Sequence, residues 1–138
     1  MAVLSDVRNA LAAAIDNVPG LRATGQMSGE INPPVAVVVP APGPFISYSE
    51  TFELNVVDIA LEVVLLVSYA DERAGQLLLD GYLSATGTSS VRAAITADPT
   101  LGGVADYCVL ETAADYGLIE WAGVQYLGAR LAVTAGTE

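Results

Sequence analysis

One stretch, Val57 to Tyr69, limits what this chain can fold into more than any other. Every odd-numbered position from 57 to 67 is apolar, which is the pattern of a β-strand with one buried face. The even positions carry Asp58 and Glu62 in the first half and Val64 and Leu66 in the second. Since a chain of 138 residues has few elements left to cover Val64 and Leu66, we expect a neighbouring copy to cover them at a subunit interface.

Length and composition indicate one domain, and we expect it to span residues 1–138. The chain is 53% hydrophobic, yet Glu62 interrupts its best apolar run, which stays short of the ~18 residues that a membrane-spanning helix needs. The N-terminus lacks the basic and apolar regions of a signal peptide. A single cysteine, Cys108, agrees with a reducing compartment. The sequence therefore predicts a protein made and kept in the cytoplasm, with no membrane partner.

Acidic residues dominate the charge: sixteen Asp and Glu stand against five Arg, with no Lys and no His, and the net charge is −11. Binding of nucleic acid through phosphate contacts needs clustered cations, so we exclude it. The acidic surface has three interpretations, which are solubility, a divalent-cation site, and a wall along which DNA passes without adhering. Because arginine is scarce, we expect Arg73, Arg92 and Arg130 to be paired with carboxylates, some of them across subunits.

Periodicity and helix breakers order the first elements. An amphipathic helix is predicted from about Leu4 to Val18, with Pro19-Gly20 closing it. Short strands follow at 21–25 and 35–39, and the prolines on both sides of the second are typical of an edge strand. Segment 40–53 is predicted to be an extended arm or part of a long hairpin.

That segment carries apolar side chains directly after a proline-rich break, Pro40-Ala-Pro-Gly-Pro44. The residues concerned are Phe45, Ile46, Tyr48 and Phe52. Exposed aromatic side chains on an arm favour contact with a partner protein or a neighbouring subunit. The alternative is that they pack over the domain's own core.

After the long strand, Asp71 is predicted to cap a helix that runs to about Ala85. Its inward stripe is predicted to consist of Ala74, Leu77, Leu78 and Tyr82. Ser89 or Ser90 then starts a short helix that Asp98-Pro99 ends, and strands at 104–113 and 119–134, the second bent near Gly128, finish the chain. The order predicts an α+β fold: a mainly antiparallel sheet, an N-terminal helix, and two helices between the long central strand and a C-terminal hairpin.

The inventory of catalytic residues is short. Without His there is no histidine base for a serine or cysteine nucleophile, and Cys108 in a predicted strand is expected to lie in the core. Zinc sites need more Cys and His, and a P-loop needs a Lys. Some carboxylates could meet to bind a divalent cation or do acid–base work, although helix capping and solvation explain them better: Asp71, Glu72, Asp106, Glu111 and Asp115. We predict no enzyme, no metal site and no cofactor.

Four stretches resemble, in order, the tail terminator proteins of long-tailed, siphovirus-type actinobacterial phages. YSETF from Tyr48 to Phe52, with the apolar strand after it, is similar to that family's entry into its main strand. Val67-Ser68 with DERAGQ (71–76) and LDGYL (79–83) is similar to its principal helix. SVRAAI (90–95) with ADPTLGG (97–103) resembles its short helix and the following turn. Tyr116-Gly117 with GVQYLGAR (123–130) resembles its last hairpin.

The resemblance implies a structural virion protein without catalytic residues. Such a protein forms a hexameric ring that caps the head-proximal end of the tail tube, stops its polymerisation and offers the surface to which the head joins. Its expected partners are sister subunits, the major tail tube protein and head-completion or neck proteins, while DNA only passes through the lumen. We therefore expect assembly in the host cytoplasm and a final place at the head–tail junction of the virion. The candidate interface residues are Phe45, Ile46, Tyr48, Phe52, Val64, Leu66, Arg73, Arg92 and Arg130.

Two other interpretations remain open at this point. The first is another head–tail connector, such as a head-completion or adaptor ring, which belongs to the same class of assembly. The second is a small acidic binding module that mimics DNA and blocks a host enzyme. The hydrophobic content of 53% argues against the second.

Overall fold

The computed structural model describes residues 4–25, 33–50, 55–68 and 72–137. In chain order the elements are α1 (Leu4–Ile15), β1 (Arg22–Thr24), β2 (Val35–Pro40), β3 (Ile46–Glu50), β4 (Asn55–Val67), α2 (Glu72–Leu83), α3 (Val91–Ala97), a 3-10 turn η1 (Leu101–Gly103), β5 (Tyr107–Trp121) and β6 (Val124–Thr137). These elements form the α+β fold that the sequence predicts.

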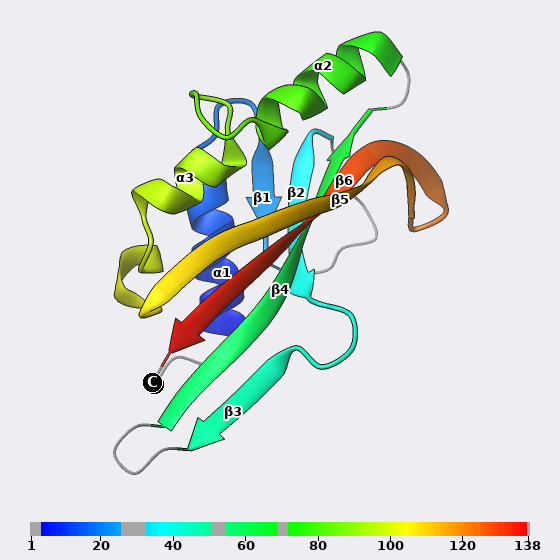
Figure 1. The fold of residues 1–138 in the computed structure, drawn as a ribbon. Helices are drawn as coiled ribbons and strands as arrows, with labels where there is room; N and C mark the ends of the chain where they lie inside the picture. Colours follow the sequence, from blue (N-terminus) through cyan, green and yellow to red (C-terminus); the bar gives the residue numbers. More distant parts are fainter. Residues whose placement is uncertain (1–3, 26–32, 51–54, 69–71, 138) are drawn as a thin grey trace.

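The strands of the described residues make one six-stranded sheet in the order β1-β2-β4-β6-β5, and β3 pairs with the first residues of β4 (Figure 1). Only β1 and β2 run parallel; the other pairs are antiparallel. The prediction that the strand at 35–39 lies at the edge of the sheet is wrong, because β1 pairs with β2 from Val35 to Val37. Its flanking prolines instead lie at or beyond the ends of the pairing.

The main core fills the space between the helices and the odd-numbered face of β4. Ile59, Leu61, Val63, Leu65 and Val67 are all buried there, as the alternation predicts. Side chains of α1, α2 and α3 form the other side of this core. All three helices therefore lie on the same face of the sheet.

The helix α2 turns Tyr82 to the core, as predicted, but the rest of the predicted stripe is wrong. Leu79 is buried instead, whereas Ala74 is exposed, Leu77 is 66% exposed and Leu78 is 41% exposed. Gly75 also faces inward, where a Cβ would lie 3.0 Å from the Ser68 carbonyl oxygen. Because a glycine adds no hydrophobicity to a sequence pattern, the pattern does not show that Gly75 and Leu79, one turn apart, share the inward side.

Ser90 starts α3, as expected. Its hydroxyl oxygen accepts a hydrogen bond from the Ala93 backbone N–H at 3.0 Å and donates to the Ser84 carbonyl oxygen. An N-cap of this kind satisfies one of the free N–H groups at a helix start. The predicted cap of α2, Asp71, lies outside the described residues.

The last two strands form one long hairpin, so the predicted division into strands at 104–113 and 119–134 is wrong. β5 runs unbroken to Trp121, and Ala122 and Gly123, with φ of 51° and 81°, make the turn into β6. The stretch around Asp115 that interrupted the predicted pattern is an irregularity in the pairing between Ala114 and Gly117. A bulge of this kind adds residues to one strand and bends it.

The tip of this hairpin folds back over the face of the sheet away from the helices, which we call the outer face (Figure 1). Val64 and Leu66, both 0% exposed, form a second buried cluster with Val35 and Val37 of β2 and Ile119 of β5. The half-buried side chains of Trp121 and Tyr126 pack against this cluster. The expectation that a neighbouring copy must cover Val64 and Leu66 is therefore wrong, because the chain covers them itself.

Candidate interaction surface

The rest of the outer face carries no cover within the described part of the chain. Residues paired across antiparallel strands share a face, and the register places small and polar side chains side by side here. We call this region the open face: Asp58, Ala60 and Glu62 of β4, Arg130, Ala132, Thr134 and Gly136 of β6, and Tyr107, Val109, Glu111, Thr112, Ala114 and Asp115 of β5. Asp58, Ala60 and Glu62 are half-buried, so this part of β4 keeps contact with solvent on its outer face.

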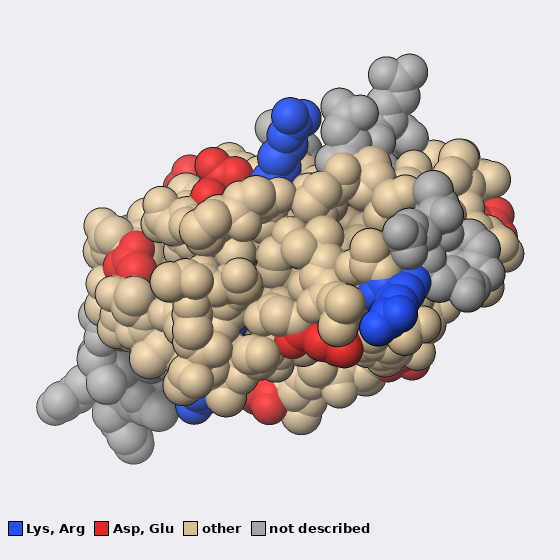
Figure 2. Space-filling model, turned by 90° about the horizontal axis from the view of Figure 1, so that it is seen from above, with Lys and Arg blue, Asp and Glu red and all other residues tan. Residues whose placement is uncertain are grey.

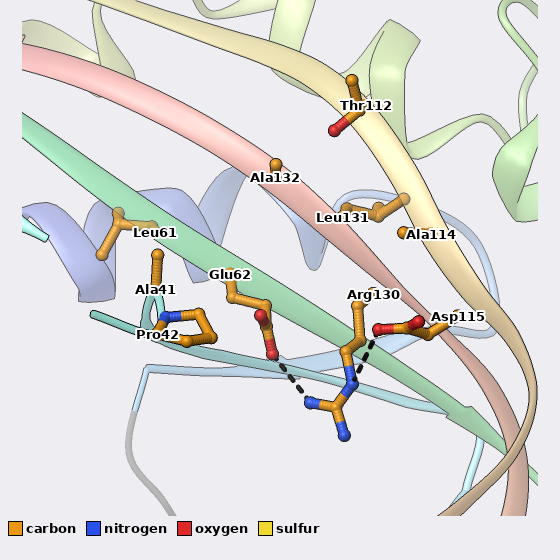
Figure 3. A pocket seen from close by; sticks show the side chains of 10 residues that line it. All are labelled: Ala41, Pro42, Leu61, Glu62, Thr112, Ala114, Asp115, Arg130, Leu131 and Ala132. Atoms are coloured by element: carbon orange, nitrogen blue, oxygen red, sulfur yellow. Dashed lines mark hydrogen bonds and ion pairs between the residues drawn. The ribbon is translucent and has the colours of Figure 1, made fainter. Parts of the chain in front are cut away.

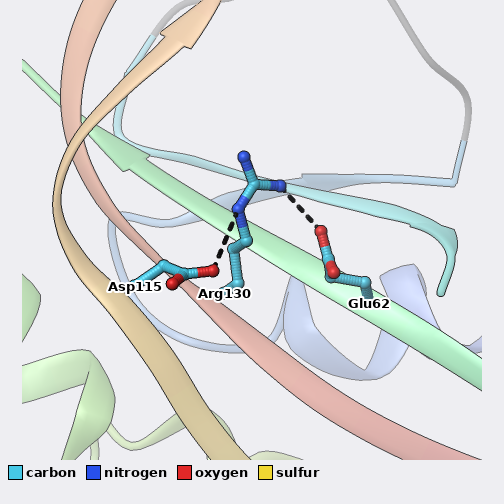
Figure 4. Close-up of polar contacts among 3 residues, drawn as sticks. All are labelled: Glu62, Asp115 and Arg130. Atoms are coloured by element: carbon cyan, nitrogen blue, oxygen red, sulfur yellow. Dashed lines mark hydrogen bonds and ion pairs between the residues drawn. The ribbon is translucent and has the colours of Figure 1, made fainter. Parts of the chain in front are cut away.

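Arg130 lies between two carboxylates at the end of the open face that adjoins the second buried cluster (Figure 4). Its Nη1 lies 2.8 Å from Glu62 Oε1, and its Nε lies 3.6 Å from Asp115 Oδ2. The Glu62 side chain is 13% exposed and the Asp115 side chain 70% exposed. The pair with Glu62 is the stronger one, because it is shorter and less accessible to solvent. Arg130 is paired as expected, and its partners are in its own chain.

The other two carboxylates of the open face are also held by donors from the sheet. The Tyr107 hydroxyl donates to Asp58, and the Thr134 hydroxyl donates to Glu111 Oε1 at 2.6 Å. The Asp58 hydrogen bond is the main cause that raises the pKa of Tyr107 to about 12, with burial as the next cause. The Tyr107 ring reaches Asp58 across Gly136, where a Cβ would overlap the ring. The open face therefore carries four carboxylates that donors of the sheet hold in place: Glu62 and Asp115 at Arg130, and Asp58 and Glu111 farther along the strands.

A pocket of about 150 Å³ lies beside Arg130 (Figure 3). The side chains around it are small or apolar, apart from the ion pairs and one threonine: Ala41, Pro42, Leu61, Glu62, Thr112, Ala114, Asp115, Arg130, Leu131 and Ala132. Alanine at 41, 114 and 132 lets another molecule approach the sheet closely.

The sheet also ends in two different edges. β5 is the outermost strand on one side, and Val109 and Leu118 on it are 51% and 53% exposed. On the other side, β1 and β3 lie outermost along β2 and β4. Edge strands offer backbone groups with which another chain can pair. At the β5 edge, the Tyr116 hydroxyl donates to Asp80 Oδ1 at 2.8 Å and so connects β5 to α2.

The predicted interface residues do not gather on one surface. Val64 and Leu66 are buried within the chain, and Arg130 lies on the open face. Arg73 is exposed on α2, and Arg92 donates to the Ala85 carbonyl oxygen at 3.2 Å. No carboxylate partner of these two is seen in the described residues, so the expected pairing is not found for them.

The proline-rich segment leads into β3. Residues 46–50 of this strand pair antiparallel with the first residues of β4, as in the predicted hairpin. Phe45 and Ile46 are half-buried, and Ile46 packs against the main core. The side chain of Tyr48 and the whole of Phe52 lie outside the described part. Whether these aromatic side chains meet a partner stays a prediction.

The described residues hold few groups with unusual chemistry. Burial, followed by the charge of Asp98, raises the pKa of the Cys108 thiol to about 11, which keeps it protonated in the core. No group of three or more His, Cys, Asp or Glu side chains in this part of the chain could hold a metal ion. None of the helices seen here has the length and apolar composition to cross a membrane.

Charged side chains are scattered rather than gathered at the end of the molecule seen from above. Figure 2 shows small acidic and basic groups there, separated by broad areas of uncharged residues. The ordered set of four carboxylates on the open face therefore differs from that end of the molecule.

Comparison with protein-family models and with curated proteins finds no match for this chain.

Proposed function

We propose that the chain is a structural virion protein that forms a ring at the head-proximal end of a phage tail tube. The ring ends polymerisation of the tube and provides the surface to which the head joins. The proposal rests on the ordered series of residues from Tyr48 to Arg130 that resembles tail terminator proteins. The order of helices and strands in the structure supports it, because it keeps the order that the resembling stretches imply.

One structural observation carries the ring part of the proposal: the sheet has two edges that differ from each other. β5 ends it on one side, and β1 and β3 end it on the other. An interface between two different surfaces of one chain is heterologous, and such contacts produce a closed ring when the rotation between copies fits. Pairing of β5 in one copy with the opposite edge of the next would repeat around the ring without leaving a free edge.

The proposed ring also explains how an acidic protein can surround DNA. Each copy carries a net charge of −11, so a lumen lined by carboxylates repels the phosphate backbone and lets it slide. The same charge makes the copies repel one another, and salt screens that repulsion.

Substituting lysine for Leu118 should prevent assembly while leaving the domain folded. The side chain is 53% exposed on β5, so the change is tolerated by the monomer but places a charge on the edge that pairs. Leu77→Lys is the matched control, because Leu77 is 66% exposed on α2 and the change of side chain is the same. Sedimentation velocity at low and high salt gives the measurement. Equal assembly of Leu118→Lys and wild type would exclude β5 from the interface.

The function itself is tested in the phage whose genome encodes the chain, by a stop codon early in its gene. Loss of a tail terminator should give tubes of uncontrolled length that fail to join heads. Loss of a head-completion or adaptor ring should instead leave tails of normal length beside unjoined heads. That second outcome would replace the proposal by the connector alternative, and normal virions would overturn both.

A further inference from the structure

We propose that the open face is a docking surface for an arginine- or lysine-bearing segment of a different protein. The inference goes beyond the ring and does not depend on it, because it concerns the outer face and not the edges of the sheet. It rests on the uncovered sheet face, the pocket beside Arg130 and the charges around them.

The shape of the open face suits a polypeptide segment. Its floor consists of small side chains, Ala60, Ala114 and Ala132, between the side chains of Val109 and Arg130. The second half of the same sheet face is closed by the hairpin tip over Val64 and Leu66, so the chain covers the large apolar residues and leaves the alanines open. The pocket of about 150 Å³ beside Arg130 has room for an extended side chain of the incoming segment.

The charges of the open face favour a cationic occupant. The open face carries four carboxylates, those of Asp58, Glu62, Glu111 and Asp115, and Arg130 is its single cation. Each carboxylate receives a hydrogen bond or ion pair from the sheet that fixes its position, yet a carboxylate has about four acceptor positions. The remaining acceptors are already oriented, so a partner cation meets them at a low cost in entropy. Asp115, 70% exposed, is the most accessible of them.

A second copy of this chain does not supply that cation well. The chain has no lysine and five arginines, and one of these is Arg130 itself. Arg8 is half-buried on α1 and Arg92 donates to a carbonyl oxygen of its own chain, which leaves Arg22 and Arg73 as the exposed arginines that a second copy has to offer. Two copies, each with a net charge of −11, also repel each other. A basic segment of another protein gains attraction at the same surface, so we assign the open face to a heterologous partner.

The test uses two designed alanine-rich peptides that differ only in carrying arginines or glutamines at the same positions. Binding to the full chain is measured by fluorescence anisotropy and mapped by amide NMR shifts. We expect the arginine peptide to bind and to shift Ala60, Thr112 and Ala132, and the glutamine peptide to bind at least tenfold more weakly.

Matched variants locate the effect. Glu62→Gln with Asp115→Asn should weaken binding of the arginine peptide about tenfold, since each lost charge contact is worth a few-fold in affinity. Asp6→Asn with Glu120→Gln changes the net charge equally outside the open face and should leave binding unchanged. If the double variant has a lower melting temperature than wild type, Asp115→Asn alone replaces it in the test, because Asp115 is exposed.

Three results would overturn the inference. Equal weakening in both double variants would mean general attraction to an acidic protein. Equal binding of the two peptides would mean that charge has no part. A change in the oligomeric state of the open-face variant without peptide would assign the surface to a second copy of the chain.

Discussion

Replacing Gly128 by alanine should cost about 3 kcal/mol of unfolding free energy or prevent folding. A Cβ there would overlap the Leu65 carbonyl oxygen of β4 and lie 3.0 Å from Ile119 Cδ1. Backbone on one side and the buried second cluster on the other leave no direction in which the methyl group can move. The hairpin would have to shift away from β4, and the pairing from Leu127 to Thr137 would shift with it.

Gly81→Ala is the matched control, and it should change stability in the opposite direction. Gly81 lies inside α2, and the nearest atom to a Cβ there is Ser89 Cβ at 3.8 Å. Alanine in a helix interior is worth ~0.5–1 kcal/mol over glycine. Urea denaturation of both variants gives the two free energies. A Gly128→Ala protein as stable as wild type would mean that the hairpin does not lie against β4 as described.

Replacing Val64 by aspartate should unfold the protein, with an expected loss of about 3–5 kcal/mol. Val64 is 0% exposed within the second cluster, and Arg130, which lies opposite it on β6, is already paired with Glu62 and Asp115. Burial of an unpaired charge is among the costliest single changes in a protein. Far-UV circular dichroism with thermal melting shows the loss directly.

Val109→Asp provides the comparison on the same sheet face. Val109 is 51% exposed on the outermost strand, so the new carboxylate stays in water and should cost less than about 1 kcal/mol. The two variants carry the same change of side chain and differ only in cover. If Val64→Asp stays folded and merely dissociates into single copies, a neighbouring subunit and not the hairpin tip covers this position.

Local patterns predict those parts of the fold that depend on local interactions. Alternating residues identify β4, helical spacing identifies α1, and Ser90 marks the start of α3. Each of these signals arises within one element and needs no knowledge of its neighbours. The fold class follows from their order.

The errors arise where distant segments meet. The cover of Val64 and Leu66 comes from residues more than fifty positions later, and the sequence does not show that the hairpin bends back at the bulge beside Asp115. The inward side of α2 depends on Gly75, whose contact with the Ser68 carbonyl oxygen is invisible in a hydrophobicity pattern.

The open face shows the same limit. Scarcity alone predicts that Arg130 is paired, but its partners follow only from the register that sets it opposite Val64 on β4 and Ala114 on β5. The sequence predicts no partner for Glu62, and it favours solvation for Asp115. Nothing in the sequence pattern indicates that Tyr107 binds Asp58, because this contact crosses an intervening strand at Gly136.

The position of β6 between β4 and β5 has a consequence for the order of events during synthesis. β6 comes after all the other described elements along the chain, yet it fills the middle of the sheet and joins β5 to everything before it. While the ribosome is still making β6, one whole side of β4 has no partner strand. The sheet can therefore form completely only after the last long strand has been synthesised. Long-range pairing of this kind is slow, and until it is complete the unpaired strands can associate with other chains.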